Sequence, residues 1–243
     1  MITIKKNKPI KLSIPCFSCD ENAVGNHLNK HPLTKFLNVY GFLCIIGRPG
    51  SGKTSMAISM ITQRKNKIYK KTHNHIILFM PSNSINSLKT NPFEKLEHIY
   101  NELDNSTISD AYDKIDEWSK EGEKTLLFID DMTADLKKSK FIIDTMKKLI
   151  YNRRHLKLNI VITAQVYPNI PLDIRKCITN LILFKPPKME LLKVFEELIE
   201  SKKDKFEDIL KLVYDEKHNF LFVNIPSQKM FKNFDEIIIN EDD

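Results

Sequence analysis

Residues 39–56 read Val-Tyr-Gly-Phe-Leu-Cys-Ile-Ile-Gly-Arg-Pro-Gly-Ser-Gly-Lys-Thr-Ser-Met, and this stretch decides the fold of the chain. The apolar run from Phe42 to Ile46 predicts a buried strand, and the residues after Thr54 have the apolar spacing of a helix. Between the two, residues 47–54 match the pattern G-x-x-x-x-G-K-[ST]. In such a loop, backbone N–H groups and the positive end of the following helix surround phosphate groups. The sequence therefore predicts a nucleoside triphosphate site; the alternative is an ordinary strand–turn–helix that matches by chance.

Each position of this loop has an expected role. Lys53 is expected to bridge the β- and γ-phosphate oxygens, and the Thr54 hydroxyl to bind Mg²⁺. The residues expected to bind the nucleotide are Gly47, Arg48, Pro49, Gly50, Ser51, Gly52, Lys53, Thr54 and Ser55.

A second apolar strand ends in two carboxylates. Residues 125–129 are followed directly by Asp130 and Asp131. Because parallel α/β sheets bind ligands at the carboxyl ends of their strands, these side chains are expected to face the phosphates. We expect Asp130 to hold Mg²⁺ and Asp131 to polarise the attacking water. The alternative is a solvated acidic turn.

Two further elements carry candidate residues. The strand at residues 158–164 delivers Gln165 at its carboxyl end, where an amide can orient water and sense the γ-phosphate. The amphipathic helix at residues 141–152 ends in Arg153 and Arg154. These cations either interact with the helix dipole or act as an arginine finger that reaches the γ-phosphate of a neighbouring subunit.

The remaining pattern predicts an α/β fold with a mostly parallel sheet and helices on both faces. Further strands are expected at residues 75–80 and 178–184, and a terminal β-hairpin at residues 220–225 and 229–234. Further helices are expected at residues 92–105, 108–120, 188–201 and 204–214. We divide the chain into an N-terminal extension of short strands (1–38) and a nucleoside triphosphate-binding domain (39–243). This domain comprises a core (39–185), C-terminal helices and hairpin (186–234) and an acidic tail (235–243).

Composition limits the class of protein. A length of 243 residues suits one large α/β domain, and no stretch approaches the roughly 18 consecutive apolar residues of a membrane span. We therefore expect no membrane partner. The net charge of +7 suits a polyanion such as nucleic acid, although a lysine-rich protein without such a partner would have the same charge.

The N-terminal extension contains a possible zinc ligand set. It consists of Cys16, Cys19, His27 and His31. The gap between the two pairs is short for a zinc finger. The sequence therefore favours two buried cysteines and two surface histidines over a zinc site.

With this loop, Asp130-Asp131, an Arg-Arg-His element and a strand ending Thr-Ala-Gln in this order, the chain resembles the viral genome-packaging ATPases of the FtsK–HerA type, found in poxviruses, giant viruses and virophages. The resemblance covers roughly residues 38–185. It implies an additional-strand sheet with the order 5-1-4-3-2. It also implies that residues 47–54 are the Walker A motif, Asp130 the Mg²⁺ acid, Asp131 the catalytic acid and Gln165 the sensor. Cellular members usually carry Glu where Asp131 stands.

The resemblance further implies a partner and an assembly. ATP and Mg²⁺ are the expected cofactors. The expected partners are double-stranded DNA, a capsid or portal component, and copies of the chain in a homo-oligomeric ring, a pentamer or hexamer. The expected place of action is the host cytoplasm, in the viral factory, or the virion. The finger position fits both Arg153 and Arg154, with Arg154 favoured and Arg175 a further candidate. Lys137, Lys138 and Lys140 either face the DNA or form a solvated charged loop.

Three other functions remain open from the residues. A cellular-type DNA translocase or conjugation ATPase would carry the same motifs. A small-molecule kinase also pairs such a loop with an acidic base, but it would need a lid with clustered arginines and would leave Gln165 without a role. A non-catalytic nucleotide-dependent scaffold is disfavoured by the complete set of Lys53, Thr54, Asp130 and Gln165.

Overall fold

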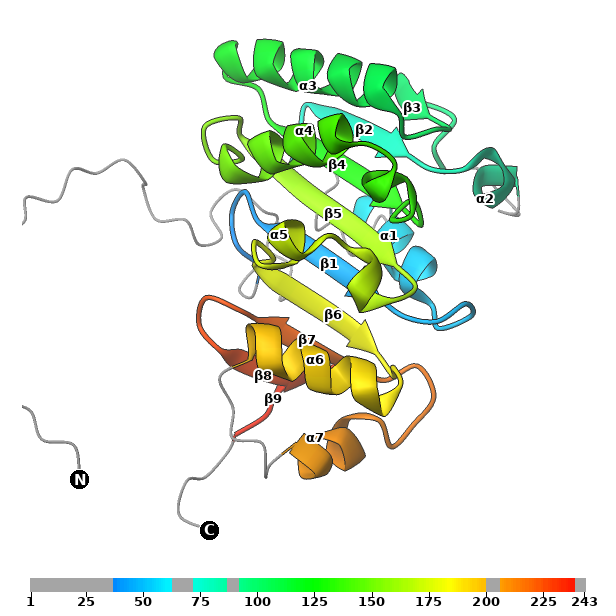
Figure 1. The fold of residues 1–243 in the computed structure, drawn as a ribbon, viewed down its shortest axis with the longest axis vertical. Coiled ribbons are helices and arrows are strands. Elements are labelled where there is room, and N and C mark those ends of the chain that lie inside the picture. Colours follow the sequence, from blue (N-terminus) through cyan, green and yellow to red (C-terminus); the bar gives the residue numbers. More distant parts are fainter. Residues whose placement is uncertain (1–36, 63–71, 87–91, 200–205, 239–243) are drawn as a thin grey trace, which may run out of the picture.

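In the computed structural model, the described residues are 37–62, 72–86, 92–199 and 206–238, and they build a layered α/β fold (Figure 1). The strands are β1 (Phe42–Ile46), β2 (His75–Phe79), β3 (His98–Tyr100), β4 (Thr125–Asp130), β5 (Leu158–Ala164), β6 (Asn180–Phe184), β7 (Phe220–Asn224), β8 (Lys229–Lys232) and β9 (Asp235–Glu236). The α-helices are α1 (Lys53–Thr62), α2 (Ser82–Asn86), α3 (Asn105–Lys120), α4 (Lys140–Tyr151), α5 (Leu172–Arg175), α6 (Lys188–Leu198) and α7 (Phe206–Val213). Two 3₁₀ turns are η2 (Asp135–Lys137) and η3 (Tyr167–Asn169).

The strands form one sheet in the order β3-β2-β4-β5-β1-β6-β7-β8-β9. The strands from β3 to β6 in this order pair in parallel, and β7, β8 and β9 continue the sheet in antiparallel pairing. When the short strand β3 is left out of the count, β1, β2, β4, β5 and β6 are strands 1 to 5 of the predicted sheet. Their arrangement β6-β1-β5-β4-β2 is then the predicted order 5-1-4-3-2. The predicted mostly parallel sheet is therefore confirmed.

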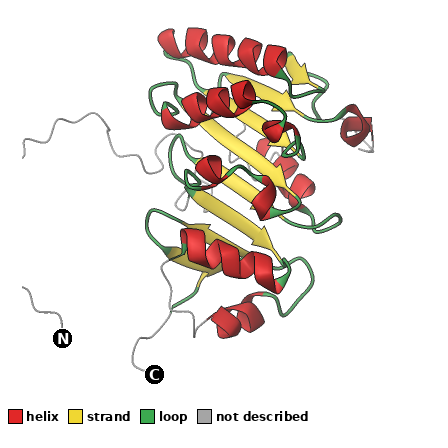
Figure 2. Ribbon diagram, viewed as in Figure 1, coloured by secondary structure: helices red, strands yellow, loops and turns green. Residues whose placement is uncertain are grey.

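Helices cover both faces of this sheet, because its central strands are apolar on both sides. Successive residues of β1 alternate between the faces: Phe42 and Cys44 pack in the core under α3 to α7, whereas Leu43 packs in the core under α1. In Figure 2 the large helices lie in front of the strands and α1 lies behind them. From β1 the chain runs to β2, which lies beyond β5 and β4 in the sheet, whereas from β5 it runs in the opposite direction, past β1, to β6. The carboxyl end of β1 therefore lies at a topological switch point, where open α/β sheets bind ligands.

One predicted helix is wrong. Residues 92–105 contain a turn at their start and the strand β3, which pairs in parallel with β2 through Ile99 opposite Leu78. Three residues are too few to show strand alternation, and their pairing with β2 overrides the helical spacing of the apolar residues around them. The next predicted helix is confirmed and begins at Asn105, where the Asp104 side chain caps it.

The C-terminal part confirms the predicted hairpin and corrects the tail. Strands β7 and β8 pair as a hairpin, and β7 also pairs with β6, so the hairpin extends the main sheet. Asp235 and Glu236, predicted as part of the acidic tail, form the short strand β9. Helices α6 and α7 lie within the two predicted helical segments at 188–201 and 204–214.

Some predictions fall on residues that the structure does not describe. Cys16, Cys19, His27 and His31, the possible zinc ligands, lie outside the described residues, as does almost all of the N-terminal extension. Within the described ranges, no group of three or more His, Cys, Asp or Glu side chains is placed to hold a metal ion. No helix of those ranges combines the length and the apolar character needed to cross a membrane.

Candidate nucleotide-binding and catalytic site

The loop between β1 and α1 has the backbone of a phosphate cradle. Gly50 and Gly52 have φ angles of +75° and +100°, values that favour glycine. At Gly47 space is the constraint, because a Cβ there would lie 2.3 Å from Ser51 Oγ and 3.0 Å from Phe184 Cβ. The Ser51 hydroxyl is buried and has no hydrogen-bond partner among the described residues. These features fit a loop that closes around phosphate groups.

Helix α1 brings two predicted residues to the end of β4. Lys53, at the first position of the helix, is only 7% exposed, and its charge acts on the Asp130 carboxylate. The Thr54 hydroxyl donates to Asp130 Oδ1 over 3.2 Å. The sequence places these residues 76 positions apart, and the parallel sheet brings their side chains into contact.

Asp130 is buried beneath the loop. Its pKa is raised mainly by burial, an effect that hydrogen bonds from Thr163 and Thr54 and the charge of Lys53 oppose. A hydroxyl and a carboxylate side by side supply the hard oxygen ligands that Mg²⁺ prefers, and a divalent cation would compensate the buried negative charge. The donor set of Thr54 and Asp130 therefore fits the predicted metal.

Asp131 and Gln165 form the second half of the site. The Gln165 side chain donates from Nε2 to Asp131 Oδ2 over 2.6 Å. Asp131 has a φ of +54°, in the left-handed region, where Asp is tolerated better than most residues. Both residues follow the ends of neighbouring parallel strands, β4 and β5, and both are only partly buried. A carboxylate oriented by an amide at this edge is suited to accept a proton from water.

Thr163 is a site residue that the sequence analysis missed. Its hydroxyl donates to Asp130 Oδ1 over 2.6 Å and accepts from the Asp131 backbone N–H over 3.0 Å. It thereby positions the Asp130 carboxylate and the backbone of Asp131. The available signal was a hydroxyl after the apolar run of residues 160–162 in β5, two residues before Gln165.

We expect the Thr163→Val variant to lose about 1–3 kcal/mol of unfolding free energy, because it removes a buried hydrogen bond to a carboxylate and leaves the Asp131 N–H without its acceptor. Urea unfolding measures this loss. Thr125→Val is the matched control: Thr125 is equally buried, at the start of the neighbouring β4, and its hydroxyl has no hydrogen-bond partner among the described residues. Equal effects of the two substitutions would contradict the role of Thr163.

The predicted arginines lie at the other edge of the sheet. Arg153 and Arg154 follow α4 and precede β5, so the length of β5, about 20 Å, separates them from Gln165. Arg153 is half-buried and its Nη1 donates to the carbonyl oxygen of Ile150 over 2.8 Å. Arg154 is exposed. Within one chain, the structure does not bring either residue to the phosphate loop.

Arg175 does not have the geometry of a finger. It is 5% exposed, and its Nε and Nη2 donate to the two carboxylate oxygens of Glu197 over 2.9 and 2.8 Å. Its guanidinium also lies over the Tyr167 ring. These contacts hold it inside the chain, where it ties η3 and α5 to α6.

Two of the three predicted loop lysines have partners in their own chain. Lys137 donates to the carbonyl oxygen of Pro168 over 3.1 Å, and Lys138 forms an ion pair with Asp135. Lys140 is exposed at the first position of α4.

Comparison with known proteins identifies the family. The family model described as "Poxvirus A32 protein" matches residues 29–243, most of the chain. The chain belongs to the poxvirus A32 protein family. The resemblance to the viral packaging ATPases, drawn from the motifs alone, is thereby confirmed. No curated protein sequence matches the chain.

Solved structures show the same fold at low identity. The DNA-packaging ATPase B204 of Sulfolobus turreted icosahedral virus is 15% identical, with a TM-score of 0.60 over 84% of this chain and 100% of that chain. The B204 genome-packaging NTPase of Sulfolobus turreted icosahedral virus 2, in complex with ATP-gammaS, is 17% identical, with a TM-score of 0.57 over 80% of this chain and 97% of that chain. The cytoplasmic domain of the type VII secretion ATPase EccC from Thermomonospora curvata is 14% identical, with a TM-score of 0.56 over 84% of this chain and 25% of that chain.

Proposed function

We propose that this A32 family member hydrolyses ATP with Mg²⁺ and uses the free energy to move double-stranded DNA into a viral capsid. The observation that carries the proposal is the assembly of Lys53, Thr54, Asp130, Asp131 and Gln165 around one phosphate loop at the carboxyl edge of the sheet. The structural relatives that are described as packaging ATPases support the same function.

Each residue of the site has its own role in ATP hydrolysis. The loop N–H groups and Lys53 would hold the β- and γ-phosphates, and Thr54 and Asp130 would hold Mg²⁺, which would neutralise charge on the phosphate oxygens. Asp131 accepts a proton from a water molecule, and the oxygen of that water attacks the γ-phosphorus. The bond between the γ-phosphorus and the β–γ bridging oxygen breaks, and ADP leaves. Gln165 orients the Asp131 carboxylate and is placed to respond when the γ-phosphate departs.

A ring of subunits would complete the site. Arg153 and Arg154 lie about 20 Å from Gln165 of their own chain, so either can reach a γ-phosphate only across a subunit boundary. We propose Arg154 as the finger, because Arg153 is half-buried and caps α4 with its guanidinium. A homo-oligomeric ring around DNA, a pentamer or hexamer docked on a capsid or portal component, would supply that boundary. It would act in the host cytoplasm or in the virion.

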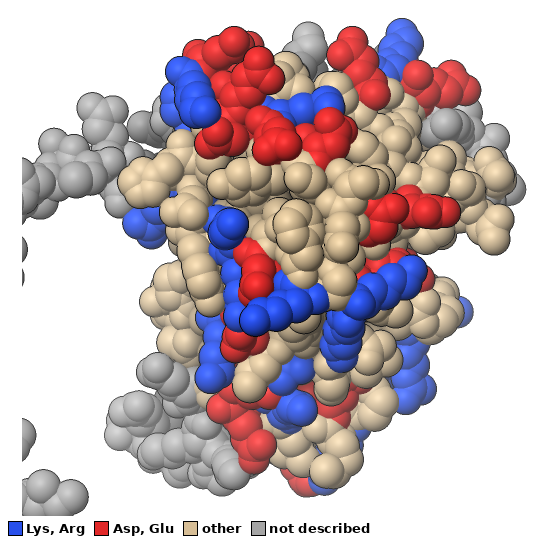
Figure 3. All heavy atoms as spheres, turned by 45° about the horizontal axis from the view of Figure 1, so that its top comes forward, with Lys and Arg blue, Asp and Glu red and all other residues tan. Residues whose placement is uncertain are grey.

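The charge distribution indicates where DNA phosphates would lie. Figure 3 shows acidic side chains gathered at the top of the molecule and Lys and Arg side chains gathered across the middle of the same face. The acidic part corresponds to the region of α3, whose surface carries Asp110, Asp113 and Asp116. Phosphate contacts would therefore be made by the basic middle of the face and by Lys140, and they would be sensitive to salt.

We expect purified protein to hydrolyse ATP faster with double-stranded DNA, and we expect added salt to weaken that stimulation steeply. A protein that makes about 6–10 phosphate contacts loses affinity by roughly 10³–10⁵ between about 50 and 200 mM salt. Steady-state phosphate release is measured with and without DNA on the assembled oligomer, with Lys53→Ala as the blank. Robust hydrolysis that ignores DNA would contradict the motor and support a kinase or another nucleotide-dependent activity.

A further inference from the structure

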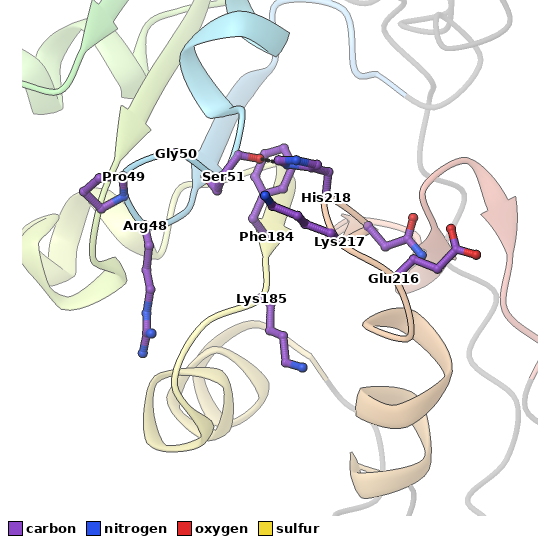
Figure 4. A pocket seen from close by; sticks show the side chains of 10 residues that line it. Arg48, Pro49, Gly50, Ser51, Phe184, Lys185, Glu216, Lys217 and His218 are labelled. Atoms are coloured by element: carbon purple, nitrogen blue, oxygen red, sulfur yellow. Dashed lines mark hydrogen bonds between the residues drawn. The ribbon is translucent and has the colours of Figure 1, made fainter.

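A pocket of about 210 Å³ adjoins the phosphate loop (Figure 4). One wall is the outer side of the loop, from Arg48 to Ser51. The opposite wall is the end of β6, at Phe184 and Lys185, and the turn before β7, at residues 216–219. The function described above uses the loop but gives no role to the opposite wall of this pocket.

The direction of the bound nucleotide follows from the sheet order. Asp131 and Gln165 follow β4 and β5, on one side of β1, and they define where the γ-phosphate lies. The pocket is bordered by β6 and β7, on the other side of β1. A nucleoside triphosphate that places its γ-phosphate toward Gln165 and its β-phosphate in the loop must extend its nucleoside toward the pocket.

The pocket has the lining that a flat aromatic base requires. The tip of the buried Phe184 ring and the His218 imidazole both lie beside Gly52, each 4.0 Å from where a Cβ on that glycine would be. Figure 4 shows the Lys217 side chain beside these rings, whereas the side chains of Lys185 and Glu216 extend away from them at the rim of the pocket. Ligand pockets in proteins combine apolar and aromatic walls with a few polar groups in this way.

His218 is held in a defined orientation although it is exposed. Its Nδ1 lies 3.1 Å from the carbonyl oxygen of Ser51 in the loop, and its φ is +69°. Since a carbonyl oxygen only accepts, Nδ1 carries the hydrogen and Nε2 points away from the loop. This hydrogen bond fixes the His218 ring beside the phosphate loop.

We propose that this pocket binds the nucleoside of the triphosphate and that His218 supplies the stacking surface for the base. The proposal rests on the proposed ATPase function and extends it to the part of the nucleotide that the loop motif does not recognise. It also gives a role to the turn between α7 and β7: the bound nucleoside ties the C-terminal extension of the sheet to the phosphate loop.

The test compares two ligands on two proteins. The ligands are ATP and inorganic tripolyphosphate, which lacks a nucleoside, each bound with Mg²⁺. The proteins are the full chain and its His218→Asn variant. Asparagine tolerates a positive φ and can still donate to the Ser51 carbonyl, but it has no ring. We expect the variant to bind ATP about tenfold more weakly, within the range of a lost base–aromatic stack, and to bind tripolyphosphate with unchanged affinity.

The other outcomes overturn the proposal. An equal loss for both ligands would mean that His218 only supports the loop, and unchanged ATP affinity would mean that the base lies elsewhere. His218→Phe is a second variant, because it restores a ring without the hydrogen bond; it is expected to bind ATP more tightly than His218→Asn, and a weaker affinity would contradict stacking. Failure of the wild-type chain to bind ATP would instead reject the ATPase function, which separates the two conclusions.

Discussion

The Asp131→Asn variant is expected to hydrolyse ATP about 10²–10⁴-fold more slowly than the wild type, with its affinity for ATP retained, because general base catalysis typically contributes a factor of that size. Asparagine keeps an oxygen that can accept from Gln165 Nε2 and tolerates the φ of +54° at this position, so the geometry of the site is preserved. Only the ability to take a proton from water is lost. Single-turnover hydrolysis on the assembled oligomer and equilibrium ATP binding measure the two quantities separately.

The matched control for this variant is Asp116→Asn. Asp116 lies on α3, where it forms an exposed ion pair with Lys120, and the substitution makes the same chemical change away from the site. We expect its hydrolysis rate to equal that of the wild type. A rate for Asp131→Asn within a few-fold of the wild type would reject Asp131 as the base and leave the attacking water to another group.

The phosphate loop could be predicted because its signal is local, whereas the strand order was expected from the resemblance to the viral packaging ATPases. Residues 42–54 combine an apolar strand, three glycines and a helix start within one short stretch. In the structure, Gly50 and Gly52 have positive φ angles, and Gly47 has no space for a side chain. Asp130, Asp131 and Gln165 could be placed together because each lies at the carboxyl end of a strand of the same parallel sheet, and carboxyl ends of parallel strands share an edge.

The features that escaped prediction depend on contacts between distant segments. Strand β3 has three residues, and its conformation comes from pairing with β2. Thr163 carries one hydroxyl in a mostly apolar strand, and its role depends on the neighbouring end of β4. His218 lies 167 residues after its partner Ser51, in a turn that no motif marks. The spacing of residues in the sequence does not indicate such contacts, because they form only when the sheet brings distant segments together.

Arg175 shows why a finger could not be chosen from sequence alone. Its position after β5 suited the role, but burial and the two hydrogen bonds to Glu197 hold it inside its own chain. The same consideration separates Arg153, whose guanidinium caps α4, from the exposed Arg154. A residue that acts on a neighbouring subunit must be exposed. Arg154 is exposed, and it lies at the edge of the sheet that is remote from the phosphate loop of its own chain.

The Arg154→Ala variant is accordingly expected to lower ATP hydrolysis by the assembled protein by roughly 10³–10⁵, the usual contribution of an arginine finger, while each subunit still binds ATP. Arg153→Ala is the comparison. It removes the Nη1 hydrogen bond to Ile150 and is expected to cost about 1 kcal/mol of stability with little effect on the rate. Phosphate release, ATP binding and urea unfolding of both variants distinguish catalysis from folding.

Mixing two inactive variants tests whether Arg154 acts between subunits. An Arg154→Ala subunit keeps its Asp131, and an Asp131→Asn subunit keeps its Arg154, so a boundary formed by the two in the right order contains one complete site. We expect hydrolysis to reappear when the variants are mixed and allowed to exchange subunits, although each alone is inactive. If Arg154 acted within its own chain, no mixture would restore activity, because every subunit would still lack one of the two groups. Recovery on mixing therefore requires that the site lie between two chains.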